Sequence, residues 1–197
     1  LFLNKEQEMY CPAKVQDNFL LHLYKGELYV YDNASLQEKK KVDILPGNTI
    51  PLNYSTQDGS AYTYFYENLI KIGNGGEIEI KKELPKNQFW ITKMFVAGDR
   101  IMAVNGNFNF NRYSLLDTQL NLLSLPDAVQ ALHINNMIFI DGRYCLLTQN
   151  GVWVYDKDWK LQGNYLSQLN VTTICKDKEG NFWLGTLGDG AFFVKDL

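Results

Sequence analysis

Few side chains in this sequence are of types that do chemistry, and their spacing forms no recognised catalytic set. The two histidines are His22, inside the apolar run 20–23, and His133, near a predicted loop. Neither has Cys or carboxylate neighbours at the spacing of a zinc site, and no GxSxG, HExxH or P-loop motif occurs. We therefore expect no catalytic residue, no metal and no cofactor. His22 is expected in the core and His133 at the surface.

The three cysteines also fail to indicate a functional site. Cys11, Cys145 and Cys175 show no CxxC spacing, and an odd number argues against a disulfide scaffold. Cys145 and Cys175 fall in apolar runs of neighbouring repeats, so we expect both as small core residues. A disulfide between these two is the alternative.

Two glycine-containing segments resemble ligand loops but are better explained as turns. Residues 73–76 lead into a strand-like run, which favours a hairpin turn over a phosphate cradle. Residues 177–181 lack the acidic twelfth position of a calcium loop and read as a polar hairpin turn. Gly185, inside an aromatic strand, is expected where two blades approach closely.

One loop has an unusual composition for a turn, because Asn and Phe alternate over 105–111 before Arg112. The first interpretation is an elongated hairpin whose aromatic rings pack on a neighbour. The second is a recognition loop, in which aromatic faces stack and amides form hydrogen bonds, as in sugar sites. Loops at the same end of neighbouring blades would contribute to such a site. The predicted ligand-binding residues are Trp90, Asn107, Phe108, Asn109, Phe110, Arg112, Gln149 and Asn150.

The elements that must position these residues follow from a repeat. A polar or Gly-containing turn followed by an apolar or aromatic run recurs along the chain. Its markers are Asn18, Gly59, Gly98, Gly142 and Gly180, in steps of 41, 39, 44 and 38 residues. About 40 residues is the length of one four-stranded propeller blade.

A second marker agrees with the first. Predicted third strands end in Asp, and Asp117, Asp156 and Asp196 are separated by 39 and 40 residues. A more polar segment follows most of them, as expected for an edge strand protected by charge. We predict an all-β fold, a β-propeller of four-stranded antiparallel blades, about five of them present, with at most one helical turn at 126–133. The expected repeats, in a single propeller domain or propeller fragment, are 9–45, 46–85, 86–126, 127–166 and 167–197.

Composition excludes several function classes. The net charge is −3 and the pI about 5.4, and no clustered basic face is visible, so we expect no direct nucleic-acid binding. No run approaches 18 apolar residues, so we expect no membrane insertion by this region. The sequence begins at Leu1 without a recognisable signal peptide, and we expect a processed or truncated chain whose targeting information lies elsewhere.

The segment 169–194 resembles the two-component regulator propeller repeat. That repeat comprises an apolar-Thr-x-Ile strand, an Asp-x-x-Gly turn, an aromatic-Trp-apolar-Gly-Thr strand, a Gly turn and an aromatic strand. A second, degraded copy covers 144–156. The landmarks of the first copy are Val171, Thr172, Ile174, Asp177, Gly180, Trp183, Gly185, Thr186, Gly188, Gly190 and Phe192.

This resemblance implies a role in signal transduction. Propellers of that family are periplasmic sensors of one-chain regulators that continue into a histidine kinase core, and many respond to oligosaccharides. By resemblance we expect a periplasmic, non-enzymatic sensor domain that binds an oligosaccharide. Its expected partners are further blades and downstream signalling domains of the same chain, and a homodimer. The alternatives are a non-catalytic scaffold or adhesion propeller, and a propeller-fold lyase or hydrolase.

The resemblance also suggests a ring of seven blades, of which this chain would be an incomplete part. At about 40 residues a blade, seven blades need about 280 residues. The alternative is a closed ring of five blades, in which residues 1–8 complete the last blade.

Overall fold

The computed structural model describes residues 9–15, 18–23, 27–35, 37–43, 54–55, 59–65, 68–84, 91–106 and 112–195. Over these residues the fold is all-β apart from one four-residue helix, as predicted. The chain divides into two compact units, Leu1–Leu123 and Ser124–Leu197. Residues 1–8, expected to complete a last blade in the five-blade alternative, lie outside the described residues.

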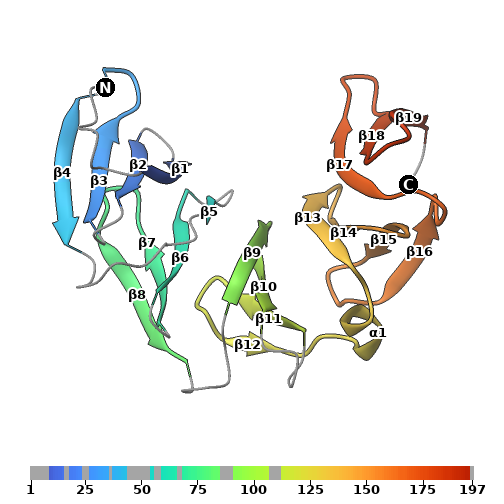
Figure 1. Cartoon of the computed structure of the whole chain (residues 1–197), viewed down its shortest axis with the longest axis horizontal. Helices are drawn as coiled ribbons and strands as arrows, with labels where there is room; N and C mark the ends of the chain where they lie inside the picture. The colour runs from blue at the N-terminus through green and yellow to red at the C-terminus, as the bar shows by residue number, and fades with distance from the viewer. Residues whose placement is uncertain are drawn as a thin grey trace. The chain divides into compact units, whose positions relative to one another are not determined.

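The first unit contains three antiparallel sheets, and in each sheet the strands pair in chain order (Figure 1). The innermost strands contact one another in succession, β1 with β5 and β5 with β9. The first sheet comprises β1 (Met9–Val15), β2 (Asn18–Leu23), β3 (Glu27–Asp32) and β4 (Glu38–Asp43). The second comprises β5 (Tyr54–Ser55), β6 (Ala61–Phe65), β7 (Asn68–Ile72) and β8 (Ile78–Glu83). The third comprises β9 (Ile91–Ala97), β10 (Arg100–Asn105), β11 (Tyr113–Asp117) and β12 (Leu122–Leu123).

The second unit contains two sheets built in the same way, preceded by the helix α1 (Asp127–Gln130). The helix is the single turn expected at 126–133, and Pro126 at its start provides no side-chain cap. The first sheet comprises β13 (Ile134–Ile140), β14 (Arg143–Thr148), β15 (Gly151–Tyr155) and β16 (Leu161–Tyr165). The second has three strands, β17 (Val171–Lys176), β18 (Phe182–Thr186) and β19 (Ala191–Val194), and β17 contacts both β13 and β14.

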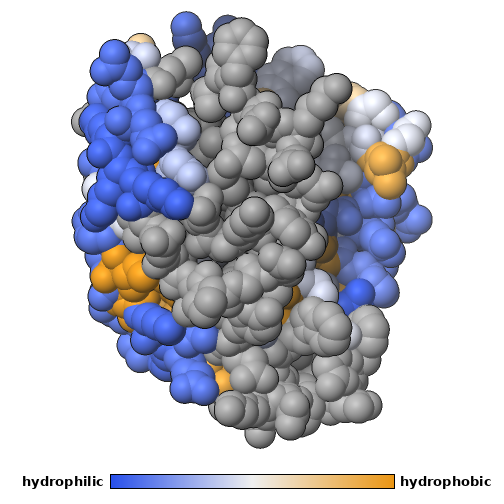
Figure 2. Space-filling model, turned by 60° about the vertical axis from the view of Figure 1, so that its left-hand side comes forward, coloured by the Kyte–Doolittle hydropathy of each residue, from blue (hydrophilic) through white to orange (hydrophobic). Residues whose placement is uncertain are grey.

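Fourth strands are the polar ones, as the sequence predicts. Strand β4 exposes Lys39, Lys40 and Lys41, and β8 alternates exposed and half-buried side chains. The view in Figure 2 shows hydrophilic side chains over most of the described surface, with hydrophobic ones in smaller patches. Charge on an outer strand discourages edge-to-edge pairing with other chains.

Apolar cores lie between successive sheets within each unit. In the first unit a cluster joins the second and third sheets, with Tyr62, Leu69, Met94 and Ile101 almost fully buried. In the second unit, one face of β13–β16 packs on one face of β17–β19. The buried members of that cluster are Cys145, Leu147, Val152, Val154, Val171, Ile174, Phe182 and Leu184. Inner strands are therefore covered on their faces by neighbouring sheets, which explains their nearly continuous apolar sequences.

A single type of Asp-capped turn recurs at the ends of strands. Asp117, Asp156 and Asp177 each accept, through Oδ1, the backbone N–H groups two and four residues later, at 2.8–2.9 Å. In each turn the residue three positions after the Asp has a positive φ. It is Gly180 in the last turn, but Leu120 and Trp159 in the other two, where the left-handed conformation is costly for a side chain.

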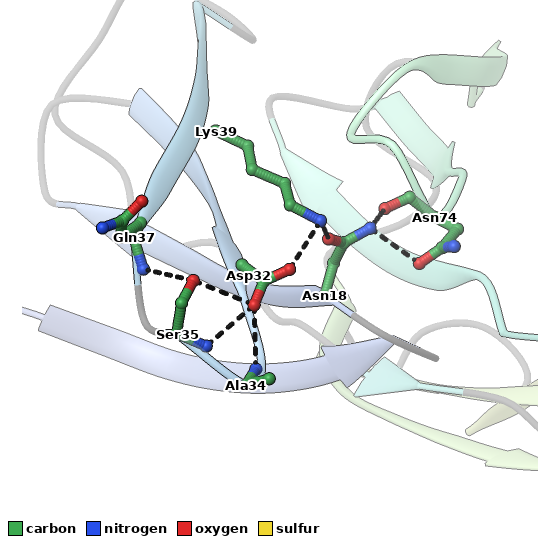
Figure 3. Close-up of polar contacts among 7 residues, drawn as sticks. All are labelled: Asn18, Asp32, Ala34, Ser35, Gln37, Lys39 and Asn74. Carbon is green, nitrogen blue, oxygen red and sulfur yellow. Dashed lines mark hydrogen bonds and ion pairs between the residues drawn. The ribbon is translucent and has the colours of Figure 1, made fainter.

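Polar side chains link the first two sheets (Figure 3). The buried Asn18 of β2 donates through Nδ2 to the backbone carbonyl and to Oδ1 of Asn74, in the turn between β7 and β8. Lys39 of β4 donates to Asn18 Oδ1 and forms an ion pair with Asp32, both at 2.9 Å. The Asp32 carboxylate also caps its own turn, accepting from Ala34 and Ser35. Every polar atom of the buried amide thus has a partner, as burial requires.

Two expectations about single residues are wrong. Cys175 is exposed, whereas Cys145 is buried, and both are free thiols. A side chain at Gly185 would meet Thr173 Cγ2 at 2.6 Å, and Thr173 belongs to the paired strand of the same sheet. The close approach is therefore within one sheet rather than between two blades. The predicted hairpin turn at 73–76 is confirmed, closed by a Gly76 N–H to Gly73 carbonyl bond.

Candidate ligand-binding face

Two turns in the second unit use the same threonine device. Thr148, at the end of β14, accepts the Asn150 N–H and donates to the Gly151 carbonyl, at 3.0 and 2.9 Å. Thr186, at the end of β18, accepts the Asp189 N–H at 3.1 Å and donates to the Gly190 carbonyl at 2.8 Å. Each hydroxyl fixes the backbone of the turn that follows it, so the side chains of both turns are held in place before any ligand arrives.

The loop between β16 and β17, residues 166–170, connects these two turns. The Gly151 N–H donates to the Leu169 carbonyl, and the Leu187 N–H donates to the Asn170 carbonyl, both at 2.8 Å. Asn135 of β13 donates through Nδ2 to Asn170 Oδ1 at 2.7 Å and to the Val171 carbonyl at 2.8 Å. We call the residues 149–150, 166–170 and 187–190 the loop face. They lie together at one end of the two sheets.

Gly151 is the point of closest approach within the loop face. Its φ is +88°, and a side chain there would lie 2.9 Å from both the carbonyl carbon and the carbonyl oxygen of Leu166, and closer still to the carbonyl oxygen of Tyr165. Only glycine has neither the side chain nor the strong preference against this conformation. The contact between the β14–β15 turn and the 166–170 loop therefore depends on this residue.

The exposed side chains of the loop face are mostly neutral hydrogen-bonding groups. Gln149, Asn150, Ser167 and Gln168 are exposed and, among the residues that the structure describes, their side chains have no hydrogen-bond partner. Leu187 adds an apolar surface that is 70% exposed, and Asp189 lies beside it. Amides and hydroxyls both donate and accept, so this arrangement suits a neutral ligand with many hydroxyl groups and an apolar ring face.

The other end of the same two sheets offers less to a ligand. The carboxylates of Asp156 and Asp177 are occupied by their own turns, and Lys176 forms an ion pair with Asp141 at 2.6 Å. Over the described residues there is no group of three or more His, Cys, Asp or Glu side chains that could hold a metal. No helix in that part of the chain is long and apolar enough to cross a membrane.

The structure places only part of the predicted site. Trp90 and the residues 107–110 lie outside the described residues. Arg112 immediately precedes β11, half-buried, with its guanidinium 5.7 Å from the centre of the Tyr113 ring, and its carbonyl accepts the Asn105 N–H. Gln149 and Asn150 are exposed in the β14–β15 turn of the second unit. That these groups form one site with Arg112 stays a prediction.

Sequence reasoning missed the 166–170 loop and Leu187 as parts of this face. The loop carries a Ser-Gln-Leu-Asn run between two strands, a polar signal that could have indicated an exposed connection. Its association with the β14–β15 turn depends on backbone hydrogen bonds between distant residues, which the sequence does not reveal. His133 was expected at the surface and is exposed.

Solved β-propeller structures are similar in fold. They include a streptogramin B lyase (TM-score 0.62, 11% identity, covering 95% of this chain and 69% of that one). BamB from Moraxella catarrhalis matches with a TM-score of 0.60 and 12% identity over 98% of this chain and 58% of that one. BBS1N, solved in complex with ARL6DN, matches with a TM-score of 0.63 and 16% identity over 100% and 68%. The chain thus spans between about half and about seven-tenths of these structures, and at such identities the similarity concerns the fold.

Sequence comparison identifies the family of one segment. No curated protein sequence matches the chain. Residues 165–188 match the sequence model of the two component regulator propeller family. The matched segment begins at Tyr165, contains the whole 166–170 loop, β17 and β18, and ends at Gly188 beside Leu187. The chain therefore folds into β-propeller sheets and carries, at residues 165–188, a repeat of the two component regulator propeller family.

Proposed function

We propose that this chain is part of the ligand-sensing propeller of a two-component signalling regulator, and that the loop face binds the ligand. The observation that carries the proposal is the overlap between the family match at 165–188 and the loop face. The matched repeat supplies the 166–170 loop, Leu187 and Gly188, which are central to that face. Loops on a rigid sheet scaffold are where binding residues are usually found.

The chemistry of the loop face favours an oligosaccharide as the ligand. Its available groups are amides and a hydroxyl beside one apolar side chain, with Asp189 as the one acidic side chain among them. A sugar presents the complementary combination, hydroxyl groups around its rim and C–H groups on its ring faces. The same resemblance places this domain in the periplasm, ahead of a kinase in the same protein, and both points are part of the proposal.

Binding rather than catalysis is the proposed activity. The two component regulator propeller is a non-catalytic repeat family. The exposed amides of the loop face can neither act as general acids or bases near neutral pH nor form a covalent intermediate. A propeller-fold lyase would need a titratable group beside the reacting atoms.

A thermal-shift screen tests the proposal, with neutral tri- to hexasaccharides of glucose, xylose and mannose as probes. A ligand that binds only the native state, present at about 100 times its Kd, stabilises by roughly 2.7 kcal/mol. We expect at least one probe to raise the Tm, and we expect Gln149→Ala combined with Gln168→Ala to abolish the shift. Gln162→Ala is the matched control, because this exposed amide lies next to the opposite turn, where it contacts Asp156.

The outcomes separate binding from folding. Both variants should keep the Tm of the unliganded protein within about 1 °C, because surface substitutions change stability by less than about 0.5 kcal/mol. A shift that survives in the double variant would place the ligand elsewhere. No shift with any probe would overturn the proposed ligand class.

A further inference from the structure

The last sheet has an open edge of unusual composition. Among the described strands, β19 pairs only with β18, whereas the other four sheets each have a fourth strand. Fourth strands such as β4 and β8 carry several charged side chains, but β19 is Ala191-Phe192-Phe193-Val194 with none. An uncharged edge strand is a template for pairing with another strand.

The hydrogen-bonding groups available at this edge can be identified. The Thr186 N–H donates to the Gly190 carbonyl, so Gly190 faces β18. Backbone groups of successive residues point to opposite sides of a strand, so those of Ala191 and Phe193 face away from β18. The edge therefore presents two N–H and two C=O groups in register.

The aromatic side chains beside this edge are also uncovered. Trp183 is 44% exposed and Phe193 50% exposed, and their rings meet edge to face at 5.3 Å. In the preceding sheet, Cys145 and Val154 hold the corresponding positions on β14 and β15 and are buried. The last sheet thus presents, around Phe193, a surface whose counterpart is covered.

We propose that β19 pairs in antiparallel fashion with β19 of a second copy of this chain, about a two-fold axis through Phe192. In this register Ala191 lies opposite Phe193 of the partner subunit, and the outward-facing backbone groups of both residues are satisfied. Asp189 and Lys195, one on each side of β19 and both exposed, then lie opposite Lys195 of the partner subunit and Asp189 of the partner subunit. This charge complementarity selects a second copy as the occupant.

The small size of the ladder indicates a weak dimer. Only four residues of each chain pair, which corresponds to a transient interface. The small Ala191 side chain leaves room beside it for the Phe193 ring of the partner subunit. Pairing of this kind extends a three-stranded sheet into a six-stranded one and leaves the loop-face amides Gln149 and Asn150 on another sheet.

Sedimentation velocity over protein concentrations up to about 1 mM tests the proposal. We expect a concentration-dependent dimer. Ala191→Pro removes one outward N–H without breaking the β18–β19 ladder and should abolish dimerisation, because proline cannot donate to the second strand. Ala191→Thr keeps the N–H and is the matched control, which should dimerise.

Charge reversal tests the register. Lys195→Glu places like charges opposite each other twice and should weaken dimerisation on the order of tenfold. Adding Asp189→Lys to that variant should restore it. A chain that stays monomeric throughout the concentration range would overturn the proposal. So would a dimer that neither Ala191→Pro nor Lys195→Glu weakens. Circular dichroism of each variant confirms that β structure is retained.

Discussion

Asp177 stabilises the turn of the matched repeat through a set of hydrogen bonds. Desolvation alone would raise its pKa, but donation from the Trp183 indole, from Asn181 and from the Glu179 N–H holds the pKa below its ordinary value. A depressed pKa in the folded state means that the carboxylate stabilises the fold above the unfolded pKa, near 4. That contribution is lost as the pH falls through the folded pKa.

We therefore expect Asp177→Asn to lower the free energy of unfolding at pH 7, and the difference from the wild type to shrink below about pH 4. Urea unfolding at pH 7 and pH 3 measures this. Asp158→Asn is the control, since Asp158 is exposed in a similar turn and its carboxylate caps nothing. Equal effects of the two substitutions at pH 7 would show that the Asp177 hydrogen bonds add no stability.

The two thiols of the second unit should differ in reactivity. Burial raises the pKa of the Cys145 thiol to about 11, whereas Cys175 is exposed. The thiolate is the reactive form, so a native protein at pH 8 should be alkylated at Cys175 and protected at Cys145 until it unfolds. Peptide mapping by mass spectrometry after iodoacetamide treatment reads out each site. Rapid labelling of Cys145 in the folded protein would contradict the packing of β14 against β17.

At the scale of elements, the sheets are positioned by turns whose geometry is local and by contacts that are not. Turn positions and the Asp at the end of third strands could be predicted, because Asp and Gly determine backbone conformation within a few residues. The exposure of Cys175 could not, because an apolar strand does not reveal which of its faces a neighbouring sheet covers. The 166–170 loop was missed because long-range backbone bonds join it to Gly151.

Gly151 and Gly188 provide a matched pair of substitutions on the loop face. Both have positive φ, but a methyl group at Gly151 collides with the carbonyls of Tyr165 and Leu166, whereas at Gly188 nothing lies within 4 Å. We expect Gly188→Ala to cost about 1–2 kcal/mol of unfolding free energy, from the backbone alone. Gly151→Ala should cost clearly more, since the loop must move as well. Equal costs, measured by urea unfolding, would contradict the close approach.

At the scale of the whole molecule, the structure combines a repeated sheet with a specialised set of loops. The period of about 40 residues in the sequence predicted the repeated sheets, because each sheet reuses the same turn chemistry. The ligand-binding residues were predicted less well: the Gln149–Asn150 turn lies in the loop face, while Trp90 and 107–110 lie outside the described residues. A site built from several loops depends on tertiary contacts.

Hydrogen–deuterium exchange tests the central claim most directly, with the oligosaccharide that gives the largest thermal shift as the probe. Ligand contacts slow exchange of the amides that they cover or rigidify. We predict that protection concentrates in peptides covering 149–151, 166–170 and 187–190, while the turn at 177–181 exchanges at its unliganded rate. Protection centred on 177–181, or absent from all three segments of the loop face at saturating oligosaccharide, would contradict the assignment of this face as the ligand-binding site.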